Sequence, residues 1–225
     1  MQSDRDNTLL VDSVHLEFGQ NQVLQSAYLT ARTGRVTGVL GRNGTGKSCL
    51  FKCIMGGIKP QNMFIRFNDE PDTDYDHIGN RVKYLPQNLF MPNNMTLDEA
   101  FSLYEVDYDG LVTFDTKFHT FQHKTFKELS GGEARIVEMY LVLMSDAEFC
   151  ILDEPFSNIA PNCVEKMQAL IREQKKSKGI IVSDHLYEDI LKVTDDLFLL
   201  RDGYTFPIKS RDDLIHNGYI PSRRA

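Results

Sequence analysis

The chain has 225 residues, 41% of them hydrophobic and 25% charged, with a formal net charge of −7. This length and composition predict one folded domain, or one core with an inserted subdomain, and exclude a disordered protein; the acidic balance gives no reason to expect nucleic-acid binding. Because no apolar run approaches the roughly 18 residues of a membrane span and the polar start is unlike a signal peptide, we expect a soluble chain whose membrane role would need a separate partner.

Short apolar runs, separated by Gly, Asn and Asp, recur along the chain and predict its strands. Residues 9–18 alternate between apolar and polar side chains, and residues 23–31 are expected to form a second strand. Later runs are short and continuously apolar, as in the buried strands of a mostly parallel sheet, at 35–40, 82–85, 149–153, 180–183 and 197–200. Helices are predicted between these strands, at 47–55, 132–144, 161–176 and 186–193. Strands that alternate with helices indicate a doubly wound α/β core.

The stretch from residue 88 to residue 128 interrupts this alternation. It is polar, rich in aromatic residues and less periodic, so we predict that it belongs to an inserted helical subdomain. Its phenylalanines are expected to pack inside that subdomain, with a partner-docking surface as the alternative: Phe114, Phe118, Phe121 and Phe126. His119 and His123 are interpreted as surface residues, because no carboxylate or cysteine pattern supports a zinc site.

Two further sets of residues are expected to have structural roles only. The cysteines, which include no CxxC pair, are expected to be free thiols: Cys49, Cys53, Cys150 and Cys163. Pro161 suits the first turn of a helix. The lysines at the other end of that helix suit its negative dipole end, and we interpret them as a solvated terminus: Lys175, Lys176 and Lys178.

Residues 41–48 (GRNGTGKS) match the phosphate-loop pattern GxxxxGK(S/T), and they stand between a predicted strand and a predicted helix, as this motif requires. Glycines let the backbone curl so that its N–H groups point at phosphate oxygens, and the helix start adds its positive dipole end. Lys47 would contact the β- and γ-phosphates, and the Ser48 hydroxyl would ligate Mg²⁺. The residues expected to hold the nucleotide here are Gly41, Arg42, Asn43, Gly44, Thr45, Gly46, Lys47, Ser48 and Cys49. Alone, this motif does not distinguish an ATPase from a GTPase or a small kinase.

A second motif, residues 149–155 (FCILDEP), is an apolar strand that ends in two acidic residues. An isolated Asp-Glu pair is usually a solvated turn, but the strand and the upstream phosphate loop favour a functional role. The end of such a strand places Asp153 beside the phosphate loop as a partner of Mg²⁺. Glu154 follows directly, where its carboxylate would polarise an attacking water.

Residues 129–133 (LSGGE) precede a predicted helix and form a second anion cradle, because small residues expose N–H groups at a positive helix end. The three motifs in this order resemble those of the ABC ATPases, in which the third motif is called the signature. In that family two domains pair head to tail, and each ATP lies between one domain's phosphate loop and the partner's signature. The resemblance therefore implies that Ser130, Gly131 and Gly132 contact a nucleotide held by a second ABC ATPase domain, as in a homodimer.

The resemblance covers nearly the whole chain and assigns three more site residues. It implies that Gln87 (in YLPQN) contacts Mg²⁺ and the attacking water, that His185 (in IIVSDH) contacts the γ-phosphate, and that Phe18 stacks on adenine. Without the resemblance, His185 would be interpreted as a surface residue and Phe18 as a core residue. The segment 212–221 (DDLIHNGYIP) also resembles the family's C-terminal helix and tail.

The implied fold is a P-loop NTPase core of the RecA type, with a mostly parallel sheet, an N-terminal antiparallel β region and an inserted α-helical subdomain. We expect a single domain over residues 1–225, with its core at 1–87 and 145–225 and its helical subdomain, which carries the signature, at 88–144. Two features depart from the family. Ala160 stands where an aspartate of the dimer interface is common, which affects the expected rate and symmetry of hydrolysis, and the segment before the signature is short.

These inferences predict an ATPase that powers a separate transmembrane permease from the cytoplasmic face of the membrane. Its cofactors would be ATP and Mg²⁺, with the metal held by Ser48, Gln87 and Asp153. Glu154 would act as general base, and Gln87 and His185 would order the reacting groups. The motifs leave two alternatives open: a soluble ABC-type ATPase that acts on a protein or nucleoprotein assembly, and a nucleotide-dependent interaction module with weak or no catalysis. A GTPase is disfavoured, because the sequence has no NKxD-type guanine motif.

Overall fold

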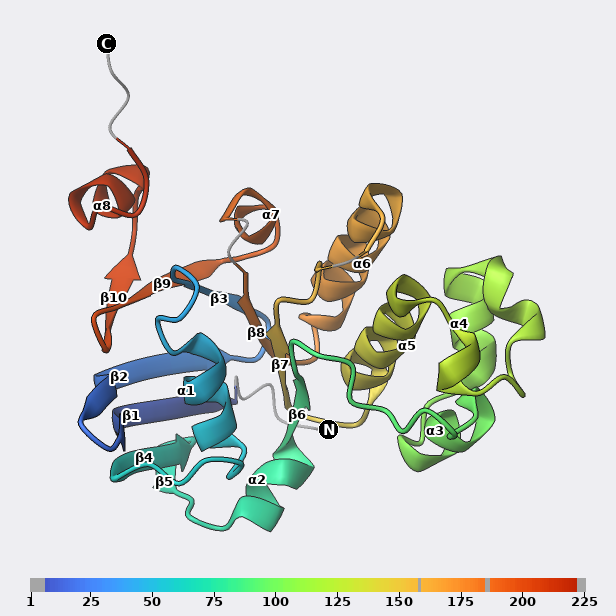
Figure 1. Cartoon of the computed structure of the whole chain (residues 1–225), viewed down its shortest axis with the longest axis horizontal. Helices are drawn as coiled ribbons and strands as arrows, with labels where there is room; N and C mark the ends of the chain where they lie inside the picture. The colour runs from blue at the N-terminus through green and yellow to red at the C-terminus, as the bar shows by residue number, and fades with distance from the viewer. Residues whose placement is uncertain (1–6, 158, 185–186, 222–225) are drawn as a thin grey trace, which may run out of the picture.

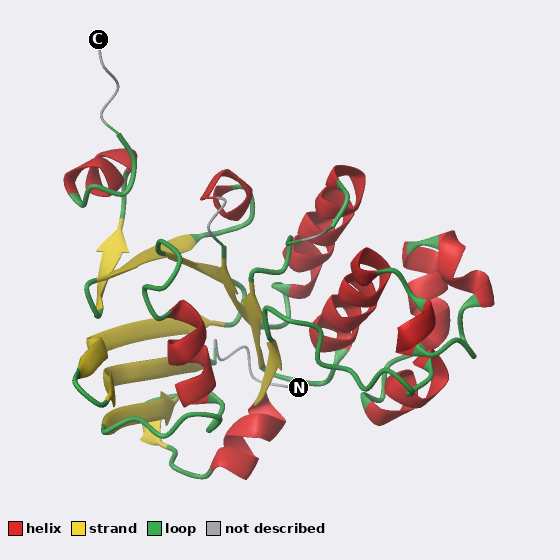
Figure 2. Cartoon of the chain, in the orientation of Figure 1, coloured by secondary structure: helices red, strands yellow, loops and turns green. Residues whose placement is uncertain are grey.

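The computed structural model describes residues 7–157, 159–184 and 187–221. Within them a ten-stranded sheet has the strand order β5-β4-β1-β2-β10-β9-β3-β8-β7-β6, with helices on both sides (Figures 1 and 2). The strands are β1 (Thr8–Phe18), β2 (Asn21–Arg32), β3 (Val36–Leu40), β4 (Asn62–Phe67), β5 (Glu70–Pro71), β6 (Val82–Leu85), β7 (Phe149–Asp153), β8 (Gly179–Ser183), β9 (Asp196–Arg201) and β10 (Tyr204–Ile208). The helices are α1 (Lys47–Ile54), α2 (Tyr75–Arg81), α3 (Leu97–Leu103), α4 (Tyr108–Phe114), α5 (Gly131–Met144), α6 (Pro161–Gln174), α7 (Tyr187–Leu191) and α8 (Arg211–His216), with 3₁₀ helices η1 (Thr116–Thr120) and η2 (Phe126–Glu128).

The parallel half of the sheet determines where the loops that carry the motifs begin. Strands β9, β3, β8, β7 and β6 are parallel neighbours in that order, and every residue of β3, β7 and β8 is buried. In the register, Ser183 is paired with Val39 on one side and with Asp153 on the other. The loops that follow β3, β8 and β7 therefore begin at the same edge of the sheet.

The antiparallel half is built from the first strands of the chain. β1 pairs with β2 and with β4, and β4 pairs with β5, all antiparallel. β10 completes the sheet by pairing parallel to β2 and antiparallel to β9. The antiparallel N-terminal region and the parallel core agree with the sequence-based expectation. The sequence analysis did not predict β4, β5, α2 or β10, which are short or largely exposed.

The hydrophobic core is divided between the two faces of the sheet. Alternate residues of β7 enter different clusters: Phe149 and Ile151 pack with α1 and the antiparallel strands, and Cys150 and Leu152 pack with α5 and α6. The second cluster continues into α3, α4, η1 and η2, which lie together at one end of the molecule, beyond α5 (Figure 1). The four cysteines are free thiols, as predicted.

The phenylalanines of the 88–128 stretch pack as the sequence analysis predicts. Phe118 is fully buried and Phe126 nearly so, while Phe114 and Phe121 are half-buried against the same cluster. His119 lies in η1, and His123 lies in the turn after it, so the two do not share a helix face. No helix in the described part of the chain combines the length and the apolar character that a membrane crossing requires.

The interpretation of the lysines after α6 is wrong for one of them. Lys175 makes an exposed ion pair with Asp195, at 2.8 Å between Nζ and Oδ1. Lys178, by contrast, is buried and donates from Nζ to the carbonyl oxygens of Ser145 and Ala147. Its ammonium thus ties the loop before β7 to the start of β8, a contact between distant segments that no local pattern predicts.

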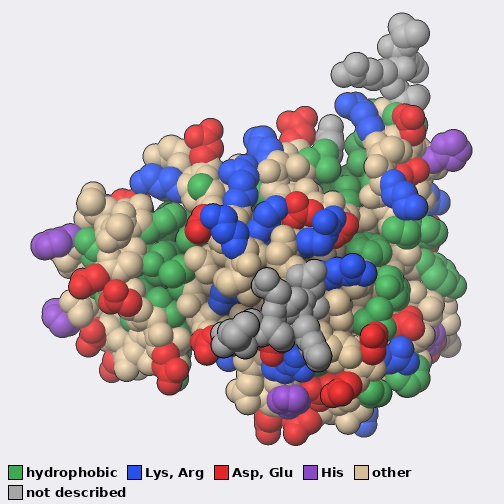
Figure 3. Space-filling view, turned by 180° about the vertical axis from the view of Figure 1, so that it is seen from behind, with side chains coloured by type: hydrophobic (Ala, Val, Ile, Leu, Met, Phe, Trp, Pro, Cys, Tyr) green, Lys and Arg blue, Asp and Glu red, His purple; other side chains and the backbone are tan. Residues whose placement is uncertain are grey.

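Charged groups of both signs are interspersed on the rear face of the molecule (Figure 3).

Replacing Phe118 by Ala should lower the free energy of unfolding by about 3–5 kcal/mol, because the ring is fully buried and contacts Phe121 edge-on at 5.5 Å between centroids. Chemical denaturation of the purified chain measures this change. Phe64→Ala is the matched control, since that ring is 53% exposed and its loss should cost less than about 1 kcal/mol. Equal losses for the two variants would contradict the packing described here.

Candidate functional site

The phosphate loop joins β3 to α1 at the edge where the parallel strands end. Gly44 and Gly46 have positive φ angles of 81° and 101°, a left-handed conformation that favours glycine. A Cβ on Gly41 would lie 2.6 Å from Thr45 Oγ1 and 2.8 Å from the carbonyl oxygen of Leu200. The motif glycines are thus required by backbone shape and by close packing, and α1 begins directly behind Gly46.

A cavity of about 380 Å³ lies against this loop. It is lined by Val23, Asn43, Gly44, Gly46, Lys47, Ser48, Cys49, Gln87 and Glu154. Lys47 is nearly buried, and its ammonium donates to the carbonyl oxygens of Gly41 at 2.8 Å and Arg42 at 3.4 Å. Burial lowers the pKa of Lys47, although the nearby carboxylates act in the opposite direction. The loop therefore holds a cation in a partly desolvated position, where a phosphate would be a strong partner.

Asp153 occupies the end of β7 and is fully buried. Its carboxylate accepts a hydrogen bond from Ser183 Oγ at 2.6 Å and one from the Tyr84 hydroxyl at 3.2 Å. Burial, together with the negative charge of Asp153, raises the pKa of Tyr84, so this phenol stays protonated and acts as the donor. Two neighbouring strands thus fix the orientation of one carboxylate.

A second cavity, of about 250 Å³, is lined by Asp153, Ser48 and Gln87 among others. Within the described residues there is no group of three or more His, Cys, Asp or Glu side chains that would hold a metal ion by itself. The oxygen atoms that could ligate a metal here belong to the Ser48 hydroxyl, the Gln87 amide and the Asp153 carboxylate. This set fits Mg²⁺, which is usually held by one or two carboxylates together with substrate phosphates.

Glu154 follows the strand in a left-handed conformation, with φ of 48°. Its backbone N–H donates to the carbonyl oxygen of Ser183 at 2.9 Å, and its carboxylate accepts from Gln87 Nε2 at 2.9 Å. The turn directs the side chain into the cavity beside the phosphate loop, which Glu154 lines. The structure therefore brings Gln87, Glu154 and the phosphate loop together, as the sequence analysis expects.

The Ser-Gly-Gly segment begins α5 with a capping box. Ser130 Oγ donates to Glu133 Oε2 at 2.7 Å and accepts from the Glu133 backbone N–H at 3.3 Å. These hydrogen bonds lower the pKa of Glu133. Neither cavity beside the phosphate loop includes Ser130 or Gly132 in its described lining.

The remaining predicted site residues have mixed outcomes. Phe18 ends β1 with its ring 52% exposed, so it is not a core residue. His185 lies outside the described residues. Ala160 is the N-cap of α6 and makes no side-chain cap hydrogen bond.

Sequence analysis missed several residues that the structure places at the site. Tyr84 and Ser183 are strand residues whose roles depend on the strand order. Arg135 and Glu138 are buried charges inside an apolar helix. The only local signal for them was that charge within an otherwise apolar run.

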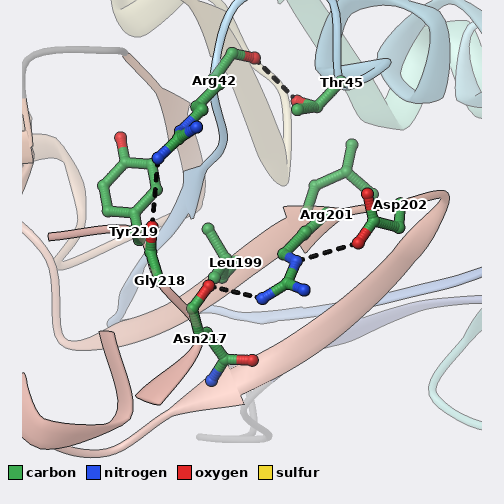
Figure 4. Close-up of a pocket in the computed structure, with 9 residues that line it drawn as sticks. Arg42, Thr45, Leu199, Arg201, Asp202, Asn217, Gly218 and Tyr219 are labelled. Atoms are coloured by element: carbon green, nitrogen blue, oxygen red, sulfur yellow. Dashed lines mark hydrogen bonds and ion pairs between the residues drawn. The ribbon is translucent and has the colours of Figure 1, made fainter. Parts of the chain in front are cut away.

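A further cavity, of about 410 Å³, lies beside the phosphate loop and the C-terminal segment. Arg42 donates to the carbonyl oxygen of Gly218 at 3.1 Å, and Arg201 donates to that of Asn217 at 2.6 Å (Figure 4). The segment that follows α8 is thereby tied both to the phosphate loop and to the end of β9.

The chain has sequence relatives among the ATP-binding proteins of ABC transporters. A family model described as "ABC transporter" matches residues 24–157. An uncharacterised ABC transporter ATP-binding protein of Rhizobium meliloti is 26% identical, with 94% of this chain and 84% of the relative covered. The lipopolysaccharide export system ATP-binding protein LptB of Acidithiobacillus ferridurans is also 26% identical, with 94% of each chain covered.

A solved structure of the ATP-binding subunit of an ABC transporter has the same fold. It superposes with a TM-score of 0.83 at 22% identity, and 95% of each chain is covered. The α/β class with a mixed, largely parallel sheet is thus confirmed.

Replacing Lys47 by Ala should weaken ATP binding about tenfold or more, because a charge-assisted hydrogen bond contributes about 1.5–3 kcal/mol. Isothermal titration calorimetry with ATP and Mg²⁺ measures the dissociation constant. Lys59→Ala is the control, since Lys59 is exposed and lines neither cavity beside the phosphate loop. Unchanged affinity in Lys47→Ala would show that the nucleotide does not bind at this loop.

Proposed function

Because the chain belongs to the ABC transporter family, we propose that it is the ATP-hydrolysing motor of a transporter whose membrane-crossing part is a separate protein. ATP-binding proteins of this family work with transmembrane partners, and the relative LptB is named for an export system. The observation that carries the proposal is the meeting of Gln87, Glu154 and the phosphate loop around one cavity. We place the protein at the cytoplasmic face of the membrane, held there by its partner.

Nucleotide binding is assigned to the phosphate loop. Backbone N–H groups of residues 43–48 and the start of α1 would contact phosphate oxygens, and the Lys47 ammonium would exchange its bonds to the loop carbonyls for bonds to phosphate. The exposed Phe18 ring would stack on adenine, and this contact would explain why a large aromatic side chain is exposed at this position. Cys49, next to Ser48, completes the wall of the cavity.

Ser48, Gln87 and Asp153 would hold Mg²⁺, which neutralises phosphate charge in the transition state when it is bound. Asp153 is suited to this role because Ser183 and Tyr84 fix its carboxylate without donating a charge. Gln87 lines both cavities, which supports a role for it in contacting both the metal and the attacking water. Its amide nitrogen donates to Glu154, which leaves its amide oxygen as the ligand atom.

Glu154 is proposed as the general base. Its carboxylate is held beside the cavity by Gln87 and by the left-handed turn of its own backbone. From there it would accept a proton from a water aligned with the γ-phosphate. His185 is assigned the contact to the γ-phosphate on the resemblance alone.

A complete site is proposed to need two copies of the domain. Ser130 caps a helix of 14 residues that Gly131 and Gly132 begin, and the positive end of this helix suits an anion; yet these three residues line neither of the two cavities described beside the phosphate loop. In a head-to-tail homodimer they would face the partner's nucleotide. ATP would join the two domains and hydrolysis would separate them, which would move the transmembrane partner between states.

The proposed domain division keeps one ATPase domain, with the core at 1–87 and 145–225 and the helical subdomain at 88–144. Helices α3, α4 and α5 belong to this subdomain, and α3 and α4 lie at the end of the molecule farthest from β1 and β2 in Figure 1. Leu89 and Leu103, which are 49% and 66% exposed, offer this part of the chain an apolar surface for the membrane partner.

Glu154→Gln should keep ATP binding, accumulate an ATP-bound dimer and lower turnover by at least about a hundredfold, since it removes a general base without changing side-chain size. Size-exclusion chromatography with ATP and a phosphate-release assay measure the two effects. Glu173→Gln, an exposed position on α6, is the control and should behave like the wild type. Rapid ATPase activity in Glu154→Gln would refute the assignment of the base.

Purifying the tagged chain from its native cells in mild detergent should recover a polytopic membrane protein in near-stoichiometric amount. Mass spectrometry of the co-eluting proteins identifies that partner. Recovery from the cytosolic fraction with soluble proteins only would refute the transporter assignment and would favour a soluble ABC-type ATPase.

A further inference from the structure

Two ionisable side chains lie buried in the middle of α5. Arg135 is 3% exposed and Glu138 is 0% exposed, in a helix whose buried residues are otherwise apolar apart from a tyrosine. Burial lowers the pKa of the Arg135 guanidinium and raises the pKa of the Glu138 carboxyl. Buried ionisable groups cost stability unless specific partners compensate for lost hydration, so their partners indicate what they are for.

The partners of Arg135 are backbone atoms of the catalytic region. Nη1 donates to the carbonyl oxygen of Pro86 at 2.5 Å, and Nη2 donates to the carbonyl oxygens of Asp153 at 2.7 Å and Glu154 at 3.0 Å. Pro86 directly precedes Gln87. One guanidinium therefore joins the backbone of the proposed metal ligand, the proposed general base and the residue before the proposed water contact.

Glu138 binds the other end of the segment 86–91, which begins at the Pro86 bound by Arg135. Its Oε1 accepts hydrogen bonds from the backbone N–H groups of Phe90 at 2.8 Å and Met91 at 2.9 Å. The segment 86–91, which contains Gln87, is thus fastened to α5 at both ends. Because Arg135 and Glu138 are about one helical turn apart, a movement of the helix displaces both ends together.

The geometry of Glu154 explains why such a support is needed. A non-glycine residue with φ of 48° has a strained backbone, which persists only where the surroundings hold it. Its carbonyl oxygen accepts hydrogen bonds from Arg135 at 3.0 Å and from the Ser157 backbone N–H at 3.3 Å, and its own N–H donates to the Ser183 carbonyl oxygen. Without the guanidinium the turn would lose the shorter of the two hydrogen bonds to its carbonyl oxygen, and the carboxylate would be held less firmly beside the phosphate loop.

We propose that Arg135 and Glu138 are positioning residues that couple the signature helix to the hydrolytic groups of the same chain. The proposal rests on the assignment of Glu154 and Gln87 given above. Ser130 caps the helix that carries both residues, and in the proposed dimer it contacts the partner's ATP. Hydrolysis by one chain would therefore depend, through α5, on the nucleotide held by the other.

Arg135→Lys tests the coupling in the full-length chain, in complex with its partner where one is recovered. A lysine keeps the charge but lacks the forked donors that reach three carbonyl groups. We expect kcat to fall about tenfold or more with the ATP dissociation constant changed less than about twofold, because misplaced catalytic groups affect the chemical step. We also expect the dependence of rate on ATP concentration to lose its cooperativity.

A second pair of variants separates positioning from folding. Glu138→Gln keeps an acceptor oxygen for Phe90 and Met91 and should lose clearly less activity than Glu138→Leu, which has none. Arg172→Lys is the matched control, because Arg172 donates to the Lys192 carbonyl oxygen at 3.2 Å, away from the site. Melting temperature and ATP affinity are measured for each variant.

The outcomes distinguish this proposal from the proposed function. If the wild type and Arg135→Lys turn over ATP equally, with the same cooperativity, the positioning role is wrong while the ATPase assignment stands. A parallel loss of ATP affinity, melting temperature and activity in Arg135→Lys would assign a merely structural role and would also overturn it. If the wild type shows no turnover even with its partner, the proposed function fails first.

Discussion

The register of three buried parallel strands is the constraint on which the rest of the structure depends. Val39, Ser183 and Asp153 lie side by side at the ends of β3, β8 and β7. Each strand contributes a different chemical element: a loop of backbone donors, a hydroxyl and a carboxylate. A shift of one residue in any strand would turn its side chains to the other face of the sheet and separate these elements. Continuous apolar burial of the three strands fixes the level at which the polar loops emerge.

The motifs were predictable from sequence because each is local. Gly41–Ser48 needs only a strand before it and a helix after it, and the Asp153-Glu154 pair needs only an apolar strand. The structure places them as expected. By contrast, β4 and β10 are short strands in which most residues are exposed or half-buried, so they lack the continuous apolar run that marks β3, β7 and β8. Each lies between two other strands and is stabilised by pairing with both, which a local pattern does not contain.

Contacts between distant segments account for the rest of what sequence analysis missed. Lys178 follows a helix and carries a charge, which favours a solvated position, but backbone carbonyls from another loop compensate for its burial. Arg135 is also a buried charge that backbone carbonyls compensate, although it lies within an apolar helix. Its partners Pro86 and Asp153 are 49 and 18 residues away in sequence. For both residues, carbonyl oxygens from distant segments determine whether the side chain is buried, and neither composition nor local sequence predicts those contacts.

The C-terminal segment has a consequence for how the protein can be observed. Gly218 accepts a hydrogen bond from Arg42, so the last described turns of the chain rest on the loop assigned to the phosphates (Figure 4). A fluorophore attached beside Tyr219 would sit at the rear of that loop, outside the two cavities described around the catalytic groups. A change in its emission on adding ATP would report a movement of this loop, without a labelled nucleotide. For the same reason, a bulky fusion joined directly after this segment would press on the phosphate loop, and a long flexible linker would avoid that contact.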